Sequence, residues 1–143
     1  MDERARLRRL RLIGRLREVE HRELAARLFA EMGNERRARS VADRTVTLLE
    51  HYSARRDACD GLDLTLQREM ARRTRQMHAS ASAHLAGLVQ QTEQAMQQER
   101  AARRRRDRIQ ELADQAARSL ATPRDTAAQI RQRAGTVLDE PGK

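Results

Sequence analysis

The stretch that decides the fold lies in the second half of the chain, from Ala81 to Leu120, and reads ASAHLAGLVQQTEQAMQQERAARRRRDRIQELADQAARSL. Small or aliphatic residues occupy every seventh position of it: Ala81, Leu88, Ala95, Ala102, Ile109 and Ala116. The companion positions hold Leu85, Ala113 and Leu120, but also Thr92, Glu99 and Arg106. A sustained seven-residue repeat is typical of a helix in a coiled coil. The polar companions predict a weakly apolar seam.

The first half of the chain also follows a helical pattern. Its apolar residues recur at steps of three and four or their sums, which is the spacing of a helix face and not of a strand. They are Leu7, Leu10, Ile13, Leu16, Leu24, Leu28, Met32, Val41, Leu48, Leu49 and Tyr52. Gly14 and Gly33 fall inside this pattern, where each glycine costs about 1 kcal/mol relative to alanine or marks a close approach. Asp2 is suited to cap the first helix.

One turn-like cluster, Cys59-Asp60-Gly61-Leu62-Asp63, separates the two halves. Gly61 can end a helix with a positive φ, and Asp63 can cap the next one. The sequence therefore predicts an all-α fold, a long antiparallel two-helix coiled-coil hairpin over residues 1–121, with its tip near 59–63. Residues whose numbers sum to about 122 should then face each other. The expected pairs are Ile109 with Ile13, Leu112 with Leu10, Val41 with Ala81, and Tyr52 with Met70.

The end of the chain is predicted to differ from the hairpin. The only prolines are Pro123 and Pro141, so about 120 residues carry no obligatory helix breaker. Thr122 followed by Pro123 is a favourable start for a short third helix. Residues 122–143 are expected to form that helix and a tail, with Asp139 to Lys143 disordered.

The chain is strongly basic, with 30 Lys and Arg residues against 21 Asp and Glu residues and a net charge of +9. Such a field attracts nucleic acid, anionic lipid or an acidic protein surface. The densest feature is the run Arg103-Arg104-Arg105-Arg106, which would form a basic collar around a helix. It could bind an acidic surface, or it could be a solvated segment whose side-chain stems cover apolar neighbours. Nucleic acid is disfavoured because no aromatic side chains accompany the arginines.

The segment from Gln76 to Gln98 is unusual for a coiled coil because its only formal charge is Glu93. A solvated coiled-coil face is normally richer in charge. Either a partner covers this segment, or it is a polar and weakly packed region.

Nothing in the sequence predicts catalysis, a cofactor or a metal site. Phe29 and Tyr52 are the only aromatics, so a compact globular core with a shaped pocket is not expected. Cys59 is the only cysteine, and the four histidines lack the spacing of helical metal ligands. Glycine-rich phosphate loops and nucleophile motifs are absent. The absence of a signal peptide and of a membrane-spanning run favours the cytoplasm.

Two segments resemble a known family. The start, Leu7-Arg8-Arg9-Leu10-Arg11-Leu12-Ile13 with Arg15-Leu16-Arg17-Glu18, resembles the basic, leucine-containing start of the FliJ family and of its YscO-like counterparts in type III secretion. The segment from Glu99 to Leu112 resembles the family's basic second-helix end. The resemblance covers about residues 4 to 120. It implies a non-catalytic coiled-coil stalk of a flagellar or type III protein export apparatus.

The resemblance also implies partners and contact residues. Family members insert their helix termini into the hexameric export ATPase and contact the export gate, and export chaperones are a further class of partner. Such a protein is cytoplasmic and peripheral at the inner membrane, and is not inserted into it. The implied ATPase-binding residues are Leu10, Ile13, Arg103, Arg104, Arg105, Arg106, Ile109 and Leu112. The implied export-gate-binding residues are Leu48, Leu49, Tyr52 and His84, although Leu48 and Tyr52 could equally lie in the intramolecular seam.

Two other functions fit the same sequence. The chain could be a generic coiled-coil adaptor or a dimerising scaffold, in which the apolar stripe pairs with another copy. It could also be a basic protein that binds nucleic acid or a membrane surface. A monomeric hairpin favours the stalk, and salt-dependent binding to polyanions favours the third hypothesis.

Overall fold

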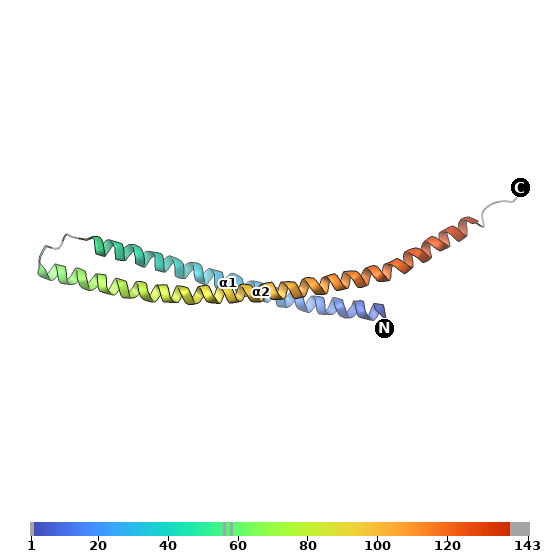
Figure 1. Ribbon diagram of the computed structural model, residues 1–143, viewed down its shortest axis with the longest axis horizontal. Helices are drawn as coiled ribbons and strands as arrows, with labels where there is room; N and C mark the ends of the chain where they lie inside the picture. Colours follow the sequence, from blue (N-terminus) through green and yellow to red (C-terminus); the bar gives the residue numbers. More distant parts are fainter. Residues whose placement is uncertain (1, 56, 58, 138–143) are drawn as a thin grey trace. The chain divides into compact units, whose positions relative to one another are not determined.

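The protein is an all-α helical hairpin, as the sequence predicts. The computed structural model describes residues 2–55, 57 and 59–137, without the side chains of 123–129 and 132–137. It contains α1 (Glu3–Ala54) and α2 (Gly61–Val137), which run antiparallel and pack against each other (Figure 1). No strand occurs among the residues that it describes.

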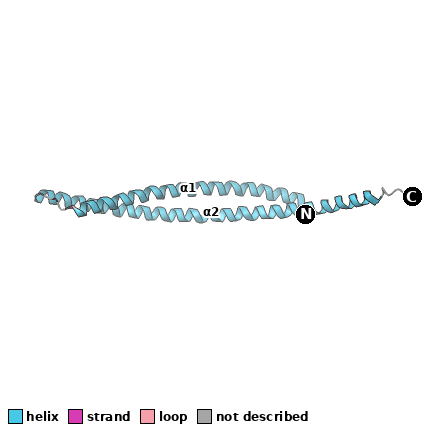
Figure 2. Ribbon diagram, turned by 90° about the horizontal axis from the view of Figure 1, so that it is seen from above, coloured by secondary structure: helices cyan, strands magenta, loops and turns pink. Residues whose placement is uncertain are grey.

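The chain divides into two compact units, each built from a segment of both helices. Unit 1 comprises Met1–Arg22 and Ala101–Lys143, and unit 2 comprises Glu23–Arg100. Within unit 2, the segment of α1 lies alongside the segment of α2 in both ribbon views (Figures 1 and 2). The connection between the helices, residues 55–60, belongs to unit 2.

Side-chain caps define where both helices begin. The Asp2 carboxylate accepts a hydrogen bond from the Arg4 amide at 3.0 Å, which confirms Asp2 as the first cap. At the second helix the cap is Asp60, whose carboxylate accepts from the Asp63 amide at 2.8 Å. The predicted roles of Gly61 and Asp63 are therefore wrong. Gly61 is the first residue of α2 and has no positive φ, while Asp63 accepts a hydrogen bond from the Cys59 amide at 3.2 Å.

The second helix continues through Pro123, so the prediction of a separate short helix after Thr122 is wrong. α2 extends without a break to Val137. The Thr122 hydroxyl donates to the Arg118 carbonyl at 2.9 Å, inside the helix, and does not cap a new one. The expected disorder of Asp139 to Lys143 concerns residues outside the described part of the chain.

Each unit has a contact that fixes how the two helices are aligned. In unit 1, a Cβ atom built on Gly14 would lie 3.7 Å from Ile109 Cγ2. In unit 2, Thr45 Oγ1 lies 3.1 Å from His78 Nδ1. The residue numbers of each pair add up to 123, which differs by one from the predicted sum of 122. One residue turns a helix by about 100°, so Gly14 and not Ile13 faces Ile109.

The seam between the helices follows one seven-residue repeat in α1 and one in α2, and every seam residue is buried or half-buried. In α1 these residues are Leu7, Leu10, Gly14, Arg17, His21, Leu24, Leu28, Glu31, Glu35, Ala38, Ala42, Thr45, Leu49 and Tyr52. In α2 they are Thr74, His78, Ala81, Leu85, Leu88, Thr92, Ala95, Glu99, Ala102, Arg106, Ile109, Ala113, Ala116 and Leu120. The seam predicted for residues 81–120 is thus confirmed.

Small residues form the buried part of this seam. The fully buried positions are Ala38, Ala42, Ala95, Ala102, Ala113 and Ala116, together with Thr45, Thr74 and Thr92. No large side chain among the described residues is fully buried. Because the distance between packed helices depends on the side chains at the contact, small residues allow the helices to approach closely. They bury little apolar area in doing so, and each therefore contributes little hydrophobic stabilisation.

Several apolar residues of the first-half stripe lie outside this seam. Ile13, Leu16, Val41 and Leu48 are exposed, with 39%, 67%, 52% and 44% of their surface accessible. The apolar residues that the sequence pattern grouped into one stripe therefore belong to two faces of α1. One is an inner face that packs on α2, and the other is an exposed outer face.

Candidate interaction surface

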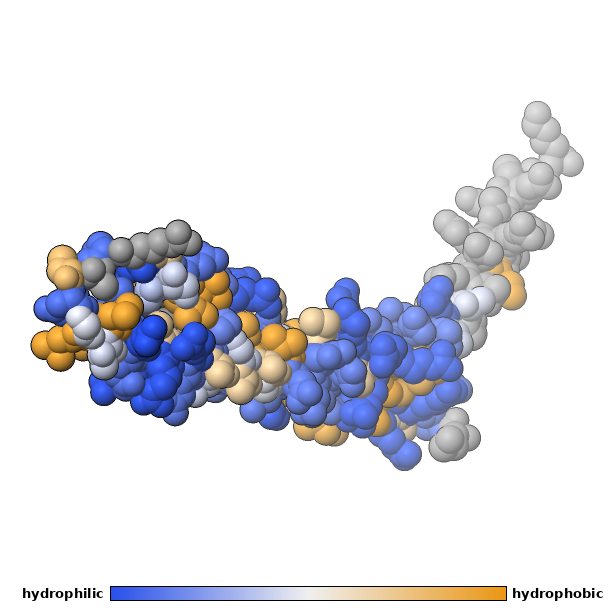
Figure 3. All heavy atoms as spheres, turned by 60° about the vertical axis from the view of Figure 1, so that its left-hand side comes forward, coloured by the Kyte–Doolittle hydropathy of each residue, from blue (hydrophilic) through white to orange (hydrophobic). Residues whose placement is uncertain are grey.

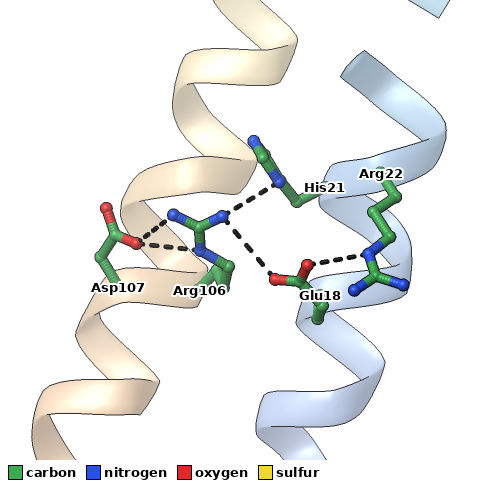
Figure 4. A network of polar contacts seen from close by, with 5 residues as sticks. All are labelled: Glu18, His21, Arg22, Arg106 and Asp107. Carbon is green, nitrogen blue, oxygen red and sulfur yellow. Dashed lines mark hydrogen bonds and ion pairs between the residues drawn. The ribbon is translucent and has the colours of Figure 1, made fainter. Parts of the chain in front are cut away.

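A polar layer crosses the seam of unit 1 and is centred on Arg106. The Arg106 guanidinium lies 3.7 Å from the Glu18 carboxylate and donates to His21 Nδ1 at 3.2 Å (Figure 4). It also donates twice to Asp107, at 2.9 and 2.6 Å. Only 28% of the Arg106 side chain is exposed.

A second polar contact joins the helices on the surface of unit 1. Glu20 receives a hydrogen bond from Arg17 at 2.6 Å and another from Arg105 of α2 at 3.3 Å. The hydrogen bond from Arg17, aided by the charge of Arg105, lowers the pKa of Glu20 below its ordinary value. Glu20 therefore remains negatively charged and links the two helices at neutral pH.

The arginine run does not form a uniform collar. Arg103, Arg104 and Arg105 are exposed, whereas Arg106 is half-buried against α1. Arg103 and Arg104 make no ion pair or hydrogen bond with any residue that the structure describes. Two arginines of the run are therefore free to contact a partner, one is shared with Glu20, and one is used inside the protein.

The other predicted ATPase-binding residues also include both half-buried and exposed side chains. Leu10, Ile109 and Leu112 are half-buried in the helix pair of unit 1, while Ile13 is 39% exposed. Leu10 and Ile109 line one interhelical groove of about 910 Å³. A second groove, of about 470 Å³, combines Ile109 and Ala101 with four arginines, namely Arg17, Arg104, Arg105 and Arg108. No acidic residue lines this second groove, whereas Glu18, Asp107 and Asp114 line the first.

The net charge is concentrated in unit 1. That unit contains 18 Lys and Arg residues and 10 Asp and Glu residues, a net charge of +8. Unit 2 contains 12 and 11, a net charge of +1. In unit 2, several arginines pair with acids on their own helix, as Arg72 and Arg73 do with Glu69 at 2.8 Å. An anionic partner is therefore attracted to unit 1 far more than to unit 2.

The four predicted export-gate residues do not form one surface. Leu49 and Tyr52 are half-buried at seam positions, and the Tyr52 ring meets the His51 ring edge-on at 5.6 Å. Leu48 is 44% exposed. His84 is exposed on α2, where it lines a groove with Val41 and residues 34, 37, 38, 81 and 88. The register places His84 level with residue 39, about two and a half turns of α1 from Leu48.

Sequence reasoning missed three exposed leucines beside the interhelical connection. Leu62, Leu64 and Leu66 are 81%, 41% and 61% exposed at the start of α2. Apolar atoms also lie among hydrophilic ones on the face shown in Figure 3, including the part near the connection. These leucines are spaced by two residues and do not follow the seven-residue repeat. The repeat therefore gives no signal for them.

Two adjacent grooves accompany the weakly charged segment of α2 in unit 2. One has a volume of about 450 Å³ and includes His84 and Leu88, and the other, of about 540 Å³, includes Met77 and Thr45. Val41 and Ala81 line both. The hydroxyl of Thr45, which lines the second groove, donates to the Ala42 carbonyl at 2.7 Å, and His78 Nε2 lies 3.4 Å from Ser82 Oγ. Neither groove is lined by an acidic residue, and each is lined by one arginine, Arg37 of α1 in the first and Arg73 of α2 in the second.

Among the residues that the structure describes, there is no cluster suited to bind a metal ion. No three His, Cys, Asp or Glu residues come together in the described part of the chain. None of the described helices is long and apolar enough to cross a membrane.

Comparisons with known proteins add no relative. The chain matches no protein-family model, and no curated protein or solved structure is significantly similar to it.

Proposed function

We propose that the protein is a non-catalytic coiled-coil stalk of a protein export apparatus, which inserts unit 1 into a hexameric export ATPase. The observation that carries this proposal is the division of charge: unit 1 has a net charge of +8 and unit 2 has +1. A ring with acidic loops can attract one region of such a helix pair without a deep pocket. The resemblance of both helix-terminal segments to the FliJ and YscO-like family supports the same proposal.

The partner-facing residues follow from their exposure. Arg103 and Arg104 are exposed and unpaired among the described residues, and Ile13 adds an accessible apolar side chain. Arg106 is assigned to the internal polar layer instead. Leu62 and Leu66, which are exposed beside the connection, join Leu48 as candidates for contact with the export gate.

The test is a pull-down of the full chain with the export ATPase of the same cell at physiological salt, with the ATPase rate measured in parallel. The variant R103E/R104E/R108E, which changes three exposed arginines and leaves the Arg105–Glu20 contact in place, should abolish binding and any increase in the ATPase rate. Arg106 is left unchanged so that the polar layer survives.

The matched control is R36E/R44E/R75E, which makes the same charge change on exposed arginines of unit 2. Its binding should remain within about threefold of the original, because screening at physiological salt confines surface electrostatics to about 8 Å. Equal loss in both triple variants would contradict a contact located on unit 1. No binding by the unmodified chain would reject the stalk.

The grooves of unit 2 favour a second candidate, a coiled-coil adaptor or dimerising scaffold. Val41 and Met77, at the grooves, are 52% and 57% exposed, and the adjoining segment of α2 carries one formal charge. A helix laid into such a groove would bury this apolar surface. Sedimentation equilibrium separates the two candidates: the stalk predicts a monomer, and the scaffold predicts a dimer that V41E/M77E disrupts.

A further inference from the structure

The outer face of α1 in unit 1 carries an exposed apolar stripe on the side of the helix that points away from the seam with α2. Leu12, Leu16 and Val19 are 66%, 67% and 52% exposed. Their spacing of four and three places them on one face of the helix, opposite the seam residues Gly14 and His21. Leu12 and Leu16 line neither groove of unit 1, whereas Val19 also lines the groove of about 910 Å³.

Arginines flank this stripe on both sides. Between Glu3 and Glu18 the chain has seven arginines and no acidic residue. At 100° per residue, Arg8 and Arg15 lie on one side of the stripe and Arg9 lies on the other. All three are exposed, and they make no ion pair or hydrogen bond with any described residue. Their positive charge is thus not neutralised within the protein.

This arrangement matches the requirements of an anionic bilayer surface. A helix that lies in the interface buries one apolar face at the headgroup boundary, while arginines beside it extend their charged groups to the lipid phosphates. Each arginine near such a surface increases partitioning about fivefold. A bilayer also accepts a convex helix face, because it imposes no shape on its ligand.

The same charge pattern disfavours a second copy of the chain as the occupant. Two copies joined through this face would bring their unpaired arginines together, and like charges held close are repulsive. We propose that the outer face of α1 between Arg8 and Val19 binds the surface of an anionic lipid bilayer. Both the lipid contact and the ATPase contact lie on unit 1, but they use different arginines, because Arg103 and Arg104 take no part in the lipid contact.

Vesicle sedimentation tests the proposal with the full chain. Binding should be strong to vesicles of phosphatidylcholine with phosphatidylglycerol, absent with phosphatidylcholine alone, and reduced as salt increases. The variant L12S/L16S/V19S should lower the partition coefficient at least tenfold, and R8Q/R9Q/R15Q should lower it about a hundredfold.

Matched controls lie in unit 2. F29S/V46S/V89S removes three exposed apolar side chains, and R36Q/R44Q/R75Q removes three exposed charges. Both should bind vesicles as the original chain does. If the control variants lose as much binding as the stripe variants, or if the stripe variants lose none, the proposal is overturned.

Fluorescence distinguishes a lipid surface from an acidic protein. The chain contains no tryptophan, so Leu16→Trp introduces a unique reporter and Phe29→Trp a control. Anionic vesicles should shift the emission of the first to shorter wavelength and leave the second unchanged. If polyglutamate binds as tightly as the vesicles and L12S/L16S/V19S leaves both affinities unchanged, the contact is one of charge alone and the lipid assignment fails.

Discussion

Neighbouring arginines of identical chemistry perform different tasks in this protein. Arg103 and Arg104 extend into solvent, whereas Arg106 is half-buried between Glu18, His21 and Asp107. The difference arises from helix geometry, since three residues turn the side chain by about 300° around the axis. Arginine is always charged, so a seam position accommodates it at low cost only where acids and hydrogen-bond acceptors surround its guanidinium. Arg106 has such an environment.

Replacing Arg106 should therefore destabilise the protein, whereas replacing Arg103 should not. Arg106→Gln removes the contacts to Glu18 and His21 across the seam and should lower the free energy of unfolding by about 1 kcal/mol. Arg103→Gln should change it by less than about 0.5 kcal/mol. Urea unfolding followed by circular dichroism measures both. Equal stability of the two variants would show that the polar layer contributes nothing.

Glu69 is the most strongly perturbed carboxylate of the described residues. Hydrogen bonds from Arg72 and Arg73 lower its pKa from 4.5 to about 2. A folded-state pKa below the unfolded value means that ionisation of the group favours the folded state. This contribution is complete above about pH 4.5 and disappears as the pH falls towards 2.

The titration of Glu69 should follow its hydrogen-bond donors. In Arg72→Gln the pKa of Glu69 should rise towards 4.5, because the largest contribution to its shift is lost. Arg68→Gln removes a neighbouring charge that makes no hydrogen bond to Glu69 and serves as the control. Carbon-detected NMR of the side-chain carboxyl group follows the titration. An unchanged pKa in Arg72→Gln would mean that this hydrogen bond does not persist in solution.

At the scale of the helices, the seam favours close approach over burial of large side chains. Its fully buried positions are alanines and threonines, and Gly14 stands opposite Ile109. A methyl group at Gly14 would lie at an ordinary contact distance of 3.7 Å from Ile109. The glycine is thus not required by space at this level of the seam, nor by a positive φ.

Gly14→Ala should stabilise α1. The change removes a helix-interior glycine and should increase the free energy of unfolding by about 1 kcal/mol, with a small further gain from contact with Ile109. Gly33→Ala is the matched control, because no atom lies within 4 Å of its added methyl group. Gly33→Ala should gain only the stability that comes from the higher helix propensity of alanine. Thermal unfolding followed by circular dichroism compares them, and a loss of stability in Gly14→Ala alone would reveal a tighter seam.

For the whole molecule, a core of small residues predicts low stability. Since no large side chain is fully buried among the described residues, the apolar area that opposes chain entropy is small. The midpoint of thermal unfolding should lie within or below about 45 to 65 °C. It should also be independent of protein concentration if the stalk is monomeric. A midpoint well above this range, or one that rises with concentration, would point to stabilisation by a second copy.

The sequence alone determined the helical class, the antiparallel pairing and nearly all of the second-helix seam. These features depend on local spacing: the seven-residue repeat, the lack of proline before Pro123 and one turn cluster. The alignment of the helices could also be predicted to within one residue. In a hairpin the residue numbers of two facing residues add up to a constant, which the position of the turn determines.

Tertiary structure decided which of several helical faces packs on the partner helix. In α1 two apolar faces coexist, and only packing on α2 separates the seam residues Leu10 and Gly14 from the exposed Leu12 and Leu16. The same packing places Arg106 inside and Arg103 outside. The physical reason is that a shift of one residue turns a helix by about 100°. An alignment that is wrong by one residue therefore still predicts which segments pair, but it can fail to predict which side chains are exposed.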